Sequence, residues 1–140
     1  MGVLKMGVSK KVLKVISIVL VAGFSQSVIA GDFSFTFEWG KIPLCDSGYP
    51  GDVPNPIFSL SNVPAGTKKI NMFMSDLDAP NYDHGGGTIE YKGQNVIQPG
   101  AFKYTSPCPP SGTRTYEWVA WVKDANDDTI GKATAKKDYP

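Results

Sequence analysis

Residues 33–39 alternate strictly between aromatic and polar side chains, and this pattern constrains the fold more than any other feature of the chain. The aromatic positions that share one face are Phe33, Phe35, Phe37 and Trp39. A β-strand turns successive side chains to opposite faces, so the pattern predicts a strand with one face buried. Residues 68–75 alternate in the same way, with Ile70, Met72 and Met74 on the apolar face. The sequence therefore predicts at least two half-buried strands.

Further strands are predicted at shorter apolar or β-branched runs, and turn residues separate them. These runs are 57–60, 88–91, 114–124 and 129–134, while 40–56 and 92–113 read as long loops and Gly85–Gly87 as a chain break. No segment carries a sustained helical stripe, and eleven prolines oppose long helices. We therefore expect a mainly β fold, an antiparallel β-sandwich with long loops and little or no C-terminal helix.

Residues 1–30 have the layout of a secretory signal peptide. Four lysines precede an apolar run at 15–24, and small residues at Val28 and Ala30 offer a cleavage site after position 30. The alternative is a membrane anchor, but ten apolar residues fall short of the roughly 20 that span a bilayer. We expect an exported protein, periplasmic or secreted, with a single domain at 31–140 and no transmembrane segment after cleavage.

Cleavage would change the charge of the protein. It removes four of fourteen basic residues and none of thirteen acidic ones, which leaves a net charge of −3. That balance does not favour nucleic acid or an anionic membrane surface as a partner.

The two cysteines, Cys45 and Cys108, read first as a disulfide, because an exported protein with an even cysteine count usually pairs them. Two unpaired thiols are the alternative. No spacing of metal-binding side chains suggests a metal site, and no cofactor is expected.

Polar residues gather directly after the strand at 68–75. Asp76 and Asp78 would point to the same side if the chain stayed extended, and could accept hydrogen bonds from a ligand. The alternative is that they cap a turn. His84, the only histidine, follows closely and could contact an anion when protonated.

A second polar group lies around the last long strand. The proline-rich segment 107–112 is stiff, and a stiff wall lowers the ordering cost of binding. Arg114 and Tyr116 are two residues apart, so they share one face of a strand. Arginine suits phosphate or carboxylate, although a surface arginine beside a core tyrosine is equally consistent with this spacing. No Gly-x-Ser-x-Gly motif indicates a nucleophile, and no enzymatic activity is expected.

Two separated motifs, in this order, resemble the phosphatidylethanolamine-binding protein family, which includes the Raf-kinase inhibitor proteins and a bacterial branch. The first motif is Asp76-Leu77-Asp78-Ala79-Pro80 with His84, and the second is Pro107-Cys108-Pro109-Pro110-Ser111-Gly112 with Tyr116. The resemblance covers roughly residues 53–135. It implies a β-sandwich with a small anion-binding pocket at one end, which accepts phosphate-like groups.

The resemblance also implies roles for the matched residues. Asp76 and Asp78 would form an acidic side, and His84 a polar wall. Pro80, Pro109 and Pro110 would shape the rim, and Tyr116 would donate its hydroxyl group. Arg114 stands where the family commonly has a histidine, and either strengthens anion binding or closes the pocket by pairing with Asp76 or Asp78.

Two functions follow from this resemblance. The first is a non-enzymatic binding protein for a small anionic or phosphorylated ligand, such as a phospholipid head group. The alternative is an inhibitor or interaction module that acts on a protein partner such as a protease or kinase, with the loop at 40–56 as contact surface.

Overall fold

The computed structural model describes residues 2–3, 31–43, 45 and 48–140. The predicted signal peptide at 1–30 lies outside these residues, apart from positions 2 and 3. The described chain forms nine strands: β1 (Ser34–Glu38), β2 (Asp52–Pro54), β3 (Ile57–Ser61), β4 (Lys69–Asp76), β5 (Asp83–Glu90), β6 (Val96–Ile97), β7 (Lys103–Thr105), β8 (Arg114–Lys123) and β9 (Thr129–Tyr139). Within the described part, no helix has the length and apolar character needed to cross a membrane.

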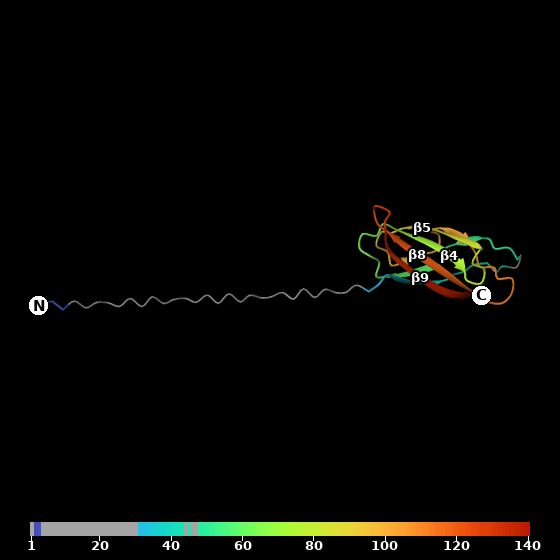
Figure 1. The fold of residues 1–140 in the computed structure, drawn as a ribbon, viewed down its shortest axis with the longest axis horizontal. Coiled ribbons are helices and arrows are strands. Elements are labelled where there is room, and N and C mark those ends of the chain that lie inside the picture. Colours follow the sequence, from blue (N-terminus) through green and yellow to red (C-terminus); the bar gives the residue numbers. More distant parts are fainter. Residues whose placement is uncertain (1, 4–30, 44, 46–47) are drawn as a thin grey trace.

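Antiparallel pairing organises the strands into three sheets. The largest has the order β5-β4-β8-β9, and Figure 1 shows these four strands side by side. A smaller sheet has the order β1-β3-β6, and β2 pairs with β7. The predicted fold class is therefore confirmed: the described residues are antiparallel β structure with long loops, and the chain ends in a strand.

The core lies between the largest sheet and the sheet of β1, β3 and β6. Trp118 on β8 and Phe58 on β3 are both fully buried, and their rings meet edge to face with centroids 5.2 Å apart. Phe102 packs on both rings. The predicted alternation is confirmed, because Phe35 and Phe37 of β1 are buried. The inward face of β4 is likewise buried at Ile70, Met72 and Met74.

Buried Asn55 fixes one of the long loops. Its amide oxygen accepts hydrogen bonds from the backbone N–H groups of residues 100, 101 and 102, at 2.9–3.2 Å. Its amide nitrogen donates to the carbonyl oxygens of Pro56 and Gln98. A single side chain thus fixes the backbone of residues 100–102, and it carries Phe102 to the core.

The glycines at 85–87 were expected to break the chain, and this prediction is wrong. Strand β5 begins at Asp83 and runs through all three glycines. Gly85 adopts a positive φ of 72°, where the pairing with β4 shifts register in a bulge. A Cβ atom at Gly86 would lie 1.9 Å from the carbonyl oxygen of Met72, and one at Gly87 would meet the Phe102 ring at 2.5 Å. The glycines therefore let β5 approach its neighbours closely. The final strand is also longer than expected, since β9 continues to Tyr139.

Substitution of Gly86 by alanine should destabilise the fold, because the added methyl group would collide with backbone rather than with a movable side chain. We expect a loss of about 1–3 kcal/mol in the free energy of unfolding, the range for overpacked sites. Urea denaturation measures this loss. Gly51→Ala is the matched control, since no atom lies within 4 Å of its Cβ position. Equal stability of the two variants would contradict the packing role of Gly86.

Candidate functional site

Three strand ends meet at one end of the largest sheet. Strand β4 ends at Asp76, where β5 and β8 both begin. The register pairs Asp76 with Tyr116 across β4 and β8, and Ser75 with Asp83 across β4 and β5. Antiparallel pairing therefore brings together two motifs that are well separated in the sequence, and places Asp76, His84, Arg114 and Tyr116 around one cavity.

Asp76 is a buried carboxylate whose two oxygens have different partners. Oδ1 accepts the backbone N–H groups of Asp78 and Ala79, at 2.8 and 3.1 Å. Oδ2 accepts a hydrogen bond from Nη1 of Arg114 at 2.8 Å. Only 2% of Asp76 is exposed. A buried charge needs such compensation, because its desolvation is costly when it is left unpaired.

Arg114 lies at the start of β8, and about a quarter of its side chain is exposed. The hydrogen bond to Asp76 raises the pKa of Arg114 above its ordinary value, so the guanidinium stays charged. Among the described residues this group donates one side-chain hydrogen bond, to Asp76. Because a guanidinium has five N–H donors in a planar fork, Arg114 keeps donors for a second acceptor.

The chain does not stay extended through Asp78, so the condition for a shared face with Asp76 is not met. The alternative, in which an aspartate caps a turn, is the one that the structure shows at Asp76. The chain turns after β4, because Asp76 Oδ1 captures the N–H groups of the next residues. Asp78 is exposed on that turn, and its Oδ2 accepts the backbone N–H of Thr115 at 3.0 Å. Asp78 thus fastens the turn to the start of β8 and does not line the cavity.

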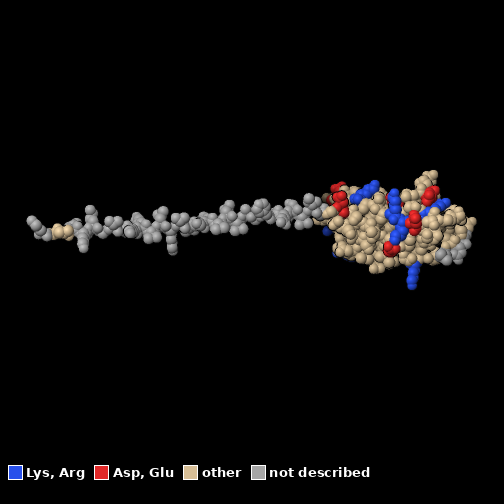
Figure 2. All heavy atoms as spheres, turned by 90° about the horizontal axis from the view of Figure 1, so that it is seen from below, with Lys and Arg blue, Asp and Glu red and all other residues tan. Residues whose placement is uncertain are grey.

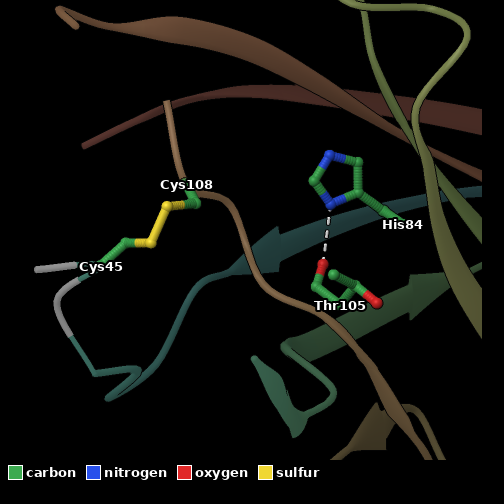
Figure 3. The surroundings of a disulfide bond; sticks show 4 residues. All are labelled: Cys45, His84, Thr105 and Cys108. Carbon is green, nitrogen blue, oxygen red and sulfur yellow. Dashed lines mark hydrogen bonds between the residues drawn. A yellow bond between two sulfur atoms is a disulfide. The ribbon is translucent and has the colours of Figure 1, made fainter. Parts of the chain in front are cut away.

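His84 is buried on the inward face of β5. Its Nδ1 lies 2.8 Å from the carbonyl oxygen of Thr105 (Figure 3). A carbonyl can only accept, so Nδ1 carries the proton of this bond. The other ring nitrogen, Nε2, lies on the side of the ring away from Thr105. Burial lowers the pKa of His84 below its ordinary value of 6.5, although the bond to Thr105 opposes the shift. The ring is therefore neutral at pH 7, with Nε2 as an acceptor.

Two tyrosine rings enclose the imidazole. Tyr116 meets it edge to face, with centroids 5.5 Å apart, and Tyr82 lies against it at 4.6 Å. Burial raises the pKa of Tyr116 to about 12, and the charge of Asp76 adds to this effect. The Tyr116 hydroxyl is therefore protonated at neutral pH and can donate a hydrogen bond.

The cavity between these groups has a volume of about 230 Å³. That is below the 300–1,000 Å³ of sites for drug-sized ligands, so only a small group fits inside. Of the residues expected in a binding site, five line the cavity: Asp76, His84, Pro110, Arg114 and Tyr116. Asp78, Pro80 and Pro109 do not line it. The role of all eight residues in ligand binding stays a prediction.

The cavity has further lining residues that were not named as ligand-binding residues from the sequence: Gly48, Pro50, Ala79, Tyr82 and Cys108. Ala79 and Cys108 belong to the two motifs that predicted the pocket, whereas the other three lie outside them. Ala79 and Tyr82 belong to the turn between Asp76 and His84, so their place in the chain was a usable signal. Gly48 and Pro50 come from a distant loop, and no local pattern links them to the site.

The disulfide explains how that loop reaches the cavity. Cys45 and Cys108 are bonded, with Cα atoms 5.4 Å apart (Figure 3), so the predicted pairing is confirmed. The bond joins the loop that carries Gly48 and Pro50 to the segment that carries Pro110. One wall of the cavity is therefore built from two segments that a covalent bond holds together. Cys108 carries no free thiol in this bonded state.

Replacement of both cysteines by serine should lower stability, since the bond closes a loop with a sequence separation of 63. The chain-entropy model gives a loss of about 4 kcal/mol in the free energy of unfolding. Denaturation of the oxidised protein, the reduced protein and the double variant measures it. Reduction should have no effect on the double variant. A double variant as stable as the oxidised protein would contradict the structural role of the bond.

The lowered pKa of His84 predicts a stability that depends on pH. Below about pH 6.5 the unfolded chain takes up a proton that the folded ring resists, so the free energy of unfolding should fall as the pH decreases. Above that pH the effect is absent. The slope is limited to about 1.4 kcal/mol per pH unit, the value for one proton. His84→Asn, which keeps an N–H group for Thr105, should lose this part of the slope. Urea denaturation from pH 5 to 7.5 compares the wild type with His84→Asn. Identical slopes of the free energy of unfolding against pH would contradict the lowered pKa of His84.

No protein-family model matches this chain, and no curated protein matches it. A solved structure that is similar in backbone is a crystal structure of a putative phosphatidylethanolamine-binding protein homologue from Chlamydia trachomatis. The two chains are 21% identical, and the alignment covers 78% of this chain and 97% of that one, with a TM-score of 0.49. Membership of the family that the sequence motifs resemble stays a prediction.

Proposed function

We propose that the protein is a non-enzymatic binding protein for a small anionic or phosphorylated group, which enters the cavity beside Arg114. One observation carries this proposal. The only arginine of the chain lines a cavity of about 230 Å³ while a buried carboxylate, Asp76, holds it in place. A guanidinium that is already oriented loses little freedom when it binds an anion, and this lowers the cost of binding.

The surrounding groups suit an anion with several oxygens. The negative charge of Asp76 is compensated by Arg114 and by two backbone N–H groups. The remaining guanidinium N–H groups and the Tyr116 hydroxyl supply donors. Burial favours the neutral form of His84, and an anion near Nε2 would favour its protonated form, so that Nε2 becomes a donor as well. Binding should therefore take up a proton.

The apolar part of the wall favours a ligand with an organic portion. Ala79, Pro50 and Pro110 line the cavity together with Tyr82, a residue that is 44% exposed. Such surfaces would contact the carbon atoms next to a phosphate, as in a phospholipid head group. The disulfide fits a protein that works in an oxidising compartment, and this supports the proposed export.

Sulfate is a suitable test ligand, because its charge does not change between pH 5 and 8. We expect calorimetry to detect sulfate binding that strengthens as the pH falls through the pKa of His84. Arg114→Lys keeps the charge but loses the fork, and should weaken binding about tenfold or more, since charge-assisted hydrogen bonds contribute about 1.5–3 kcal/mol. Phosphoethanolamine should bind more tightly than sulfate if the apolar wall contributes.

Lys103→Gln is the matched control, because it removes an exposed positive charge on β7 that does not line the cavity. It should leave sulfate binding unchanged. Equal affinities of the wild type, Arg114→Lys and Lys103→Gln would overturn the proposal. Binding that is unchanged between pH 5 and 8, or equally pH-dependent in His84→Asn, would remove His84 from the site.

A further inference from the structure

Tyr82 is a residue of the cavity at the strand ends to which the sequence motifs gave no role. It lies on the turn between β4 and β5, two residues before His84, and it lines the cavity. Its backbone N–H donates to the carbonyl oxygen of Ala79 at 2.9 Å. Asp76 Oδ1 holds the same turn through the N–H groups of Asp78 and Ala79. The backbone that carries Tyr82 is therefore fixed.

The Tyr82 ring is the aromatic neighbour of His84 that faces solvent. The two ring centres are 4.6 Å apart, with their planes inclined at 57°. Tyr82 is 44% exposed, whereas His84 is 3% exposed. Tyr116, the other ring against the imidazole, is 1% exposed. Part of Tyr82 therefore lies between the imidazole and bulk water, and removal of its side chain would open His84 to solvent.

Burial is the main influence on the charge of His84. It lowers the pKa of the imidazole, while the hydrogen bond to the Thr105 carbonyl oxygen and the charges of Asp76 and Asp83 act in the opposite direction. The Arg114 guanidinium lowers this pKa further. Because burial outweighs each of these groups from β4, β5, β7 and β8, whatever keeps water from the ring controls how readily it takes up a proton.

Exclusion of water also strengthens the attraction between a protonated imidazole and an anion. On the face shown in Figure 2, basic and acidic side chains lie next to one another in open solvent, where water and salt weaken their attraction. In a site closed to water, two such charges interact several times more strongly. A ring that covers His84 therefore makes the imidazole hard to protonate in the free protein and easy to protonate beside an anion.

We propose that Tyr82 is a positioning residue of the anion site, whose ring keeps bulk water from His84 and so couples anion binding to proton uptake. This inference rests on the proposed binding of an anion in the same cavity. The ring supplies the cover, and not the phenolic hydroxyl group, because the contact with the imidazole is one between rings. A site coupled in this way binds its anion more tightly as the pH falls and releases it as the pH rises.

The free protein tests the cover. His84 is the only histidine of the chain, so a single imidazole signal in an NMR titration reports its pKa without ambiguity. Tyr82→Ala should raise the pKa of His84 towards its ordinary value of 6.5, because water then reaches the ring. Tyr82→Phe keeps the ring and should leave this pKa at the wild-type value. This measurement needs no anion.

Sulfate tests the coupling. In the wild type and in Tyr82→Phe, saturating sulfate should raise the pKa of His84 by about one unit or more, which is a tenfold preference of the anion for the protonated imidazole. In Tyr82→Ala the rise should be less than half as large, and sulfate binding at pH 5 should weaken several-fold. If sulfate leaves the wild-type signal unchanged, the proposed anion site falls and the coupling falls with it, whereas the free protein still decides whether Tyr82 is a cover.

Leu77→Ala is the matched control, because Leu77 lies on the same turn, is 41% exposed and does not line the cavity. It should change neither the pKa of His84 nor sulfate binding. The proposal is overturned if Tyr82→Ala leaves the pKa of His84 in the free protein unchanged. It is also overturned if Tyr82→Phe behaves like Tyr82→Ala, since the hydroxyl group and not the ring would then be the active part. The melting temperature of each variant shows that it is folded during the titration.

Discussion

The ion pair and hydrogen bonds of the buried Asp76 carboxylate are the interactions on which the cavity at the strand ends depends. One oxygen turns the chain after β4, and the other orients Arg114 at the start of β8. The backbone and the electrostatics of the cavity are thus set by the same group. Loss of this carboxylate would release the turn that carries Ala79 and Tyr82, and would free Arg114 at the same time.

The pairing of Arg114 with Asp76 has a second consequence. From the sequence, this arginine either assists anion binding or closes the pocket by pairing with a carboxylate. In the structure it pairs, and it still lines the cavity. A planar fork can serve two acceptors at once, which a lysine ammonium does with less directional control. The ion pair is therefore compatible with an open site.

The sequence predicted the parts of the fold in which local pattern and tertiary burial agree. Alternation identified β1 and β4, because each strand has one face in the core. The sequence-based prediction of a chain break at Gly85–Gly87 was wrong. Glycine is needed at positions 86 and 87 because β4 and Phe102 approach closely, whereas the local sequence indicates only a flexible backbone. At Asp78 the alternative interpretation holds, because a side-chain bond from Asp76 bends the chain out of the extended form that a shared face would need. No local pattern marks Gly48 and Pro50 as site residues. They could have been inferred only through the predicted Cys45–Cys108 bond, which joins their loop to the segment that carries Pro110.

The cavity at the strand ends combines a few polar groups with an apolar surface. It holds one guanidinium and one imidazole within mainly apolar walls. This combination suits a compact anionic group with a small organic portion.

The most direct test of the account uses the fact that Arg114 is the only arginine of the chain. Its Nε–Hε group gives one unambiguous signal in a ¹⁵N spectrum of the labelled protein. If Arg114 contacts an anion in the cavity while Asp76 holds it, that signal should shift and exchange more slowly with water when sulfate is added. A signal that stays unchanged at saturating sulfate, or one that behaves as a freely rotating side chain without ligand, would contradict the account.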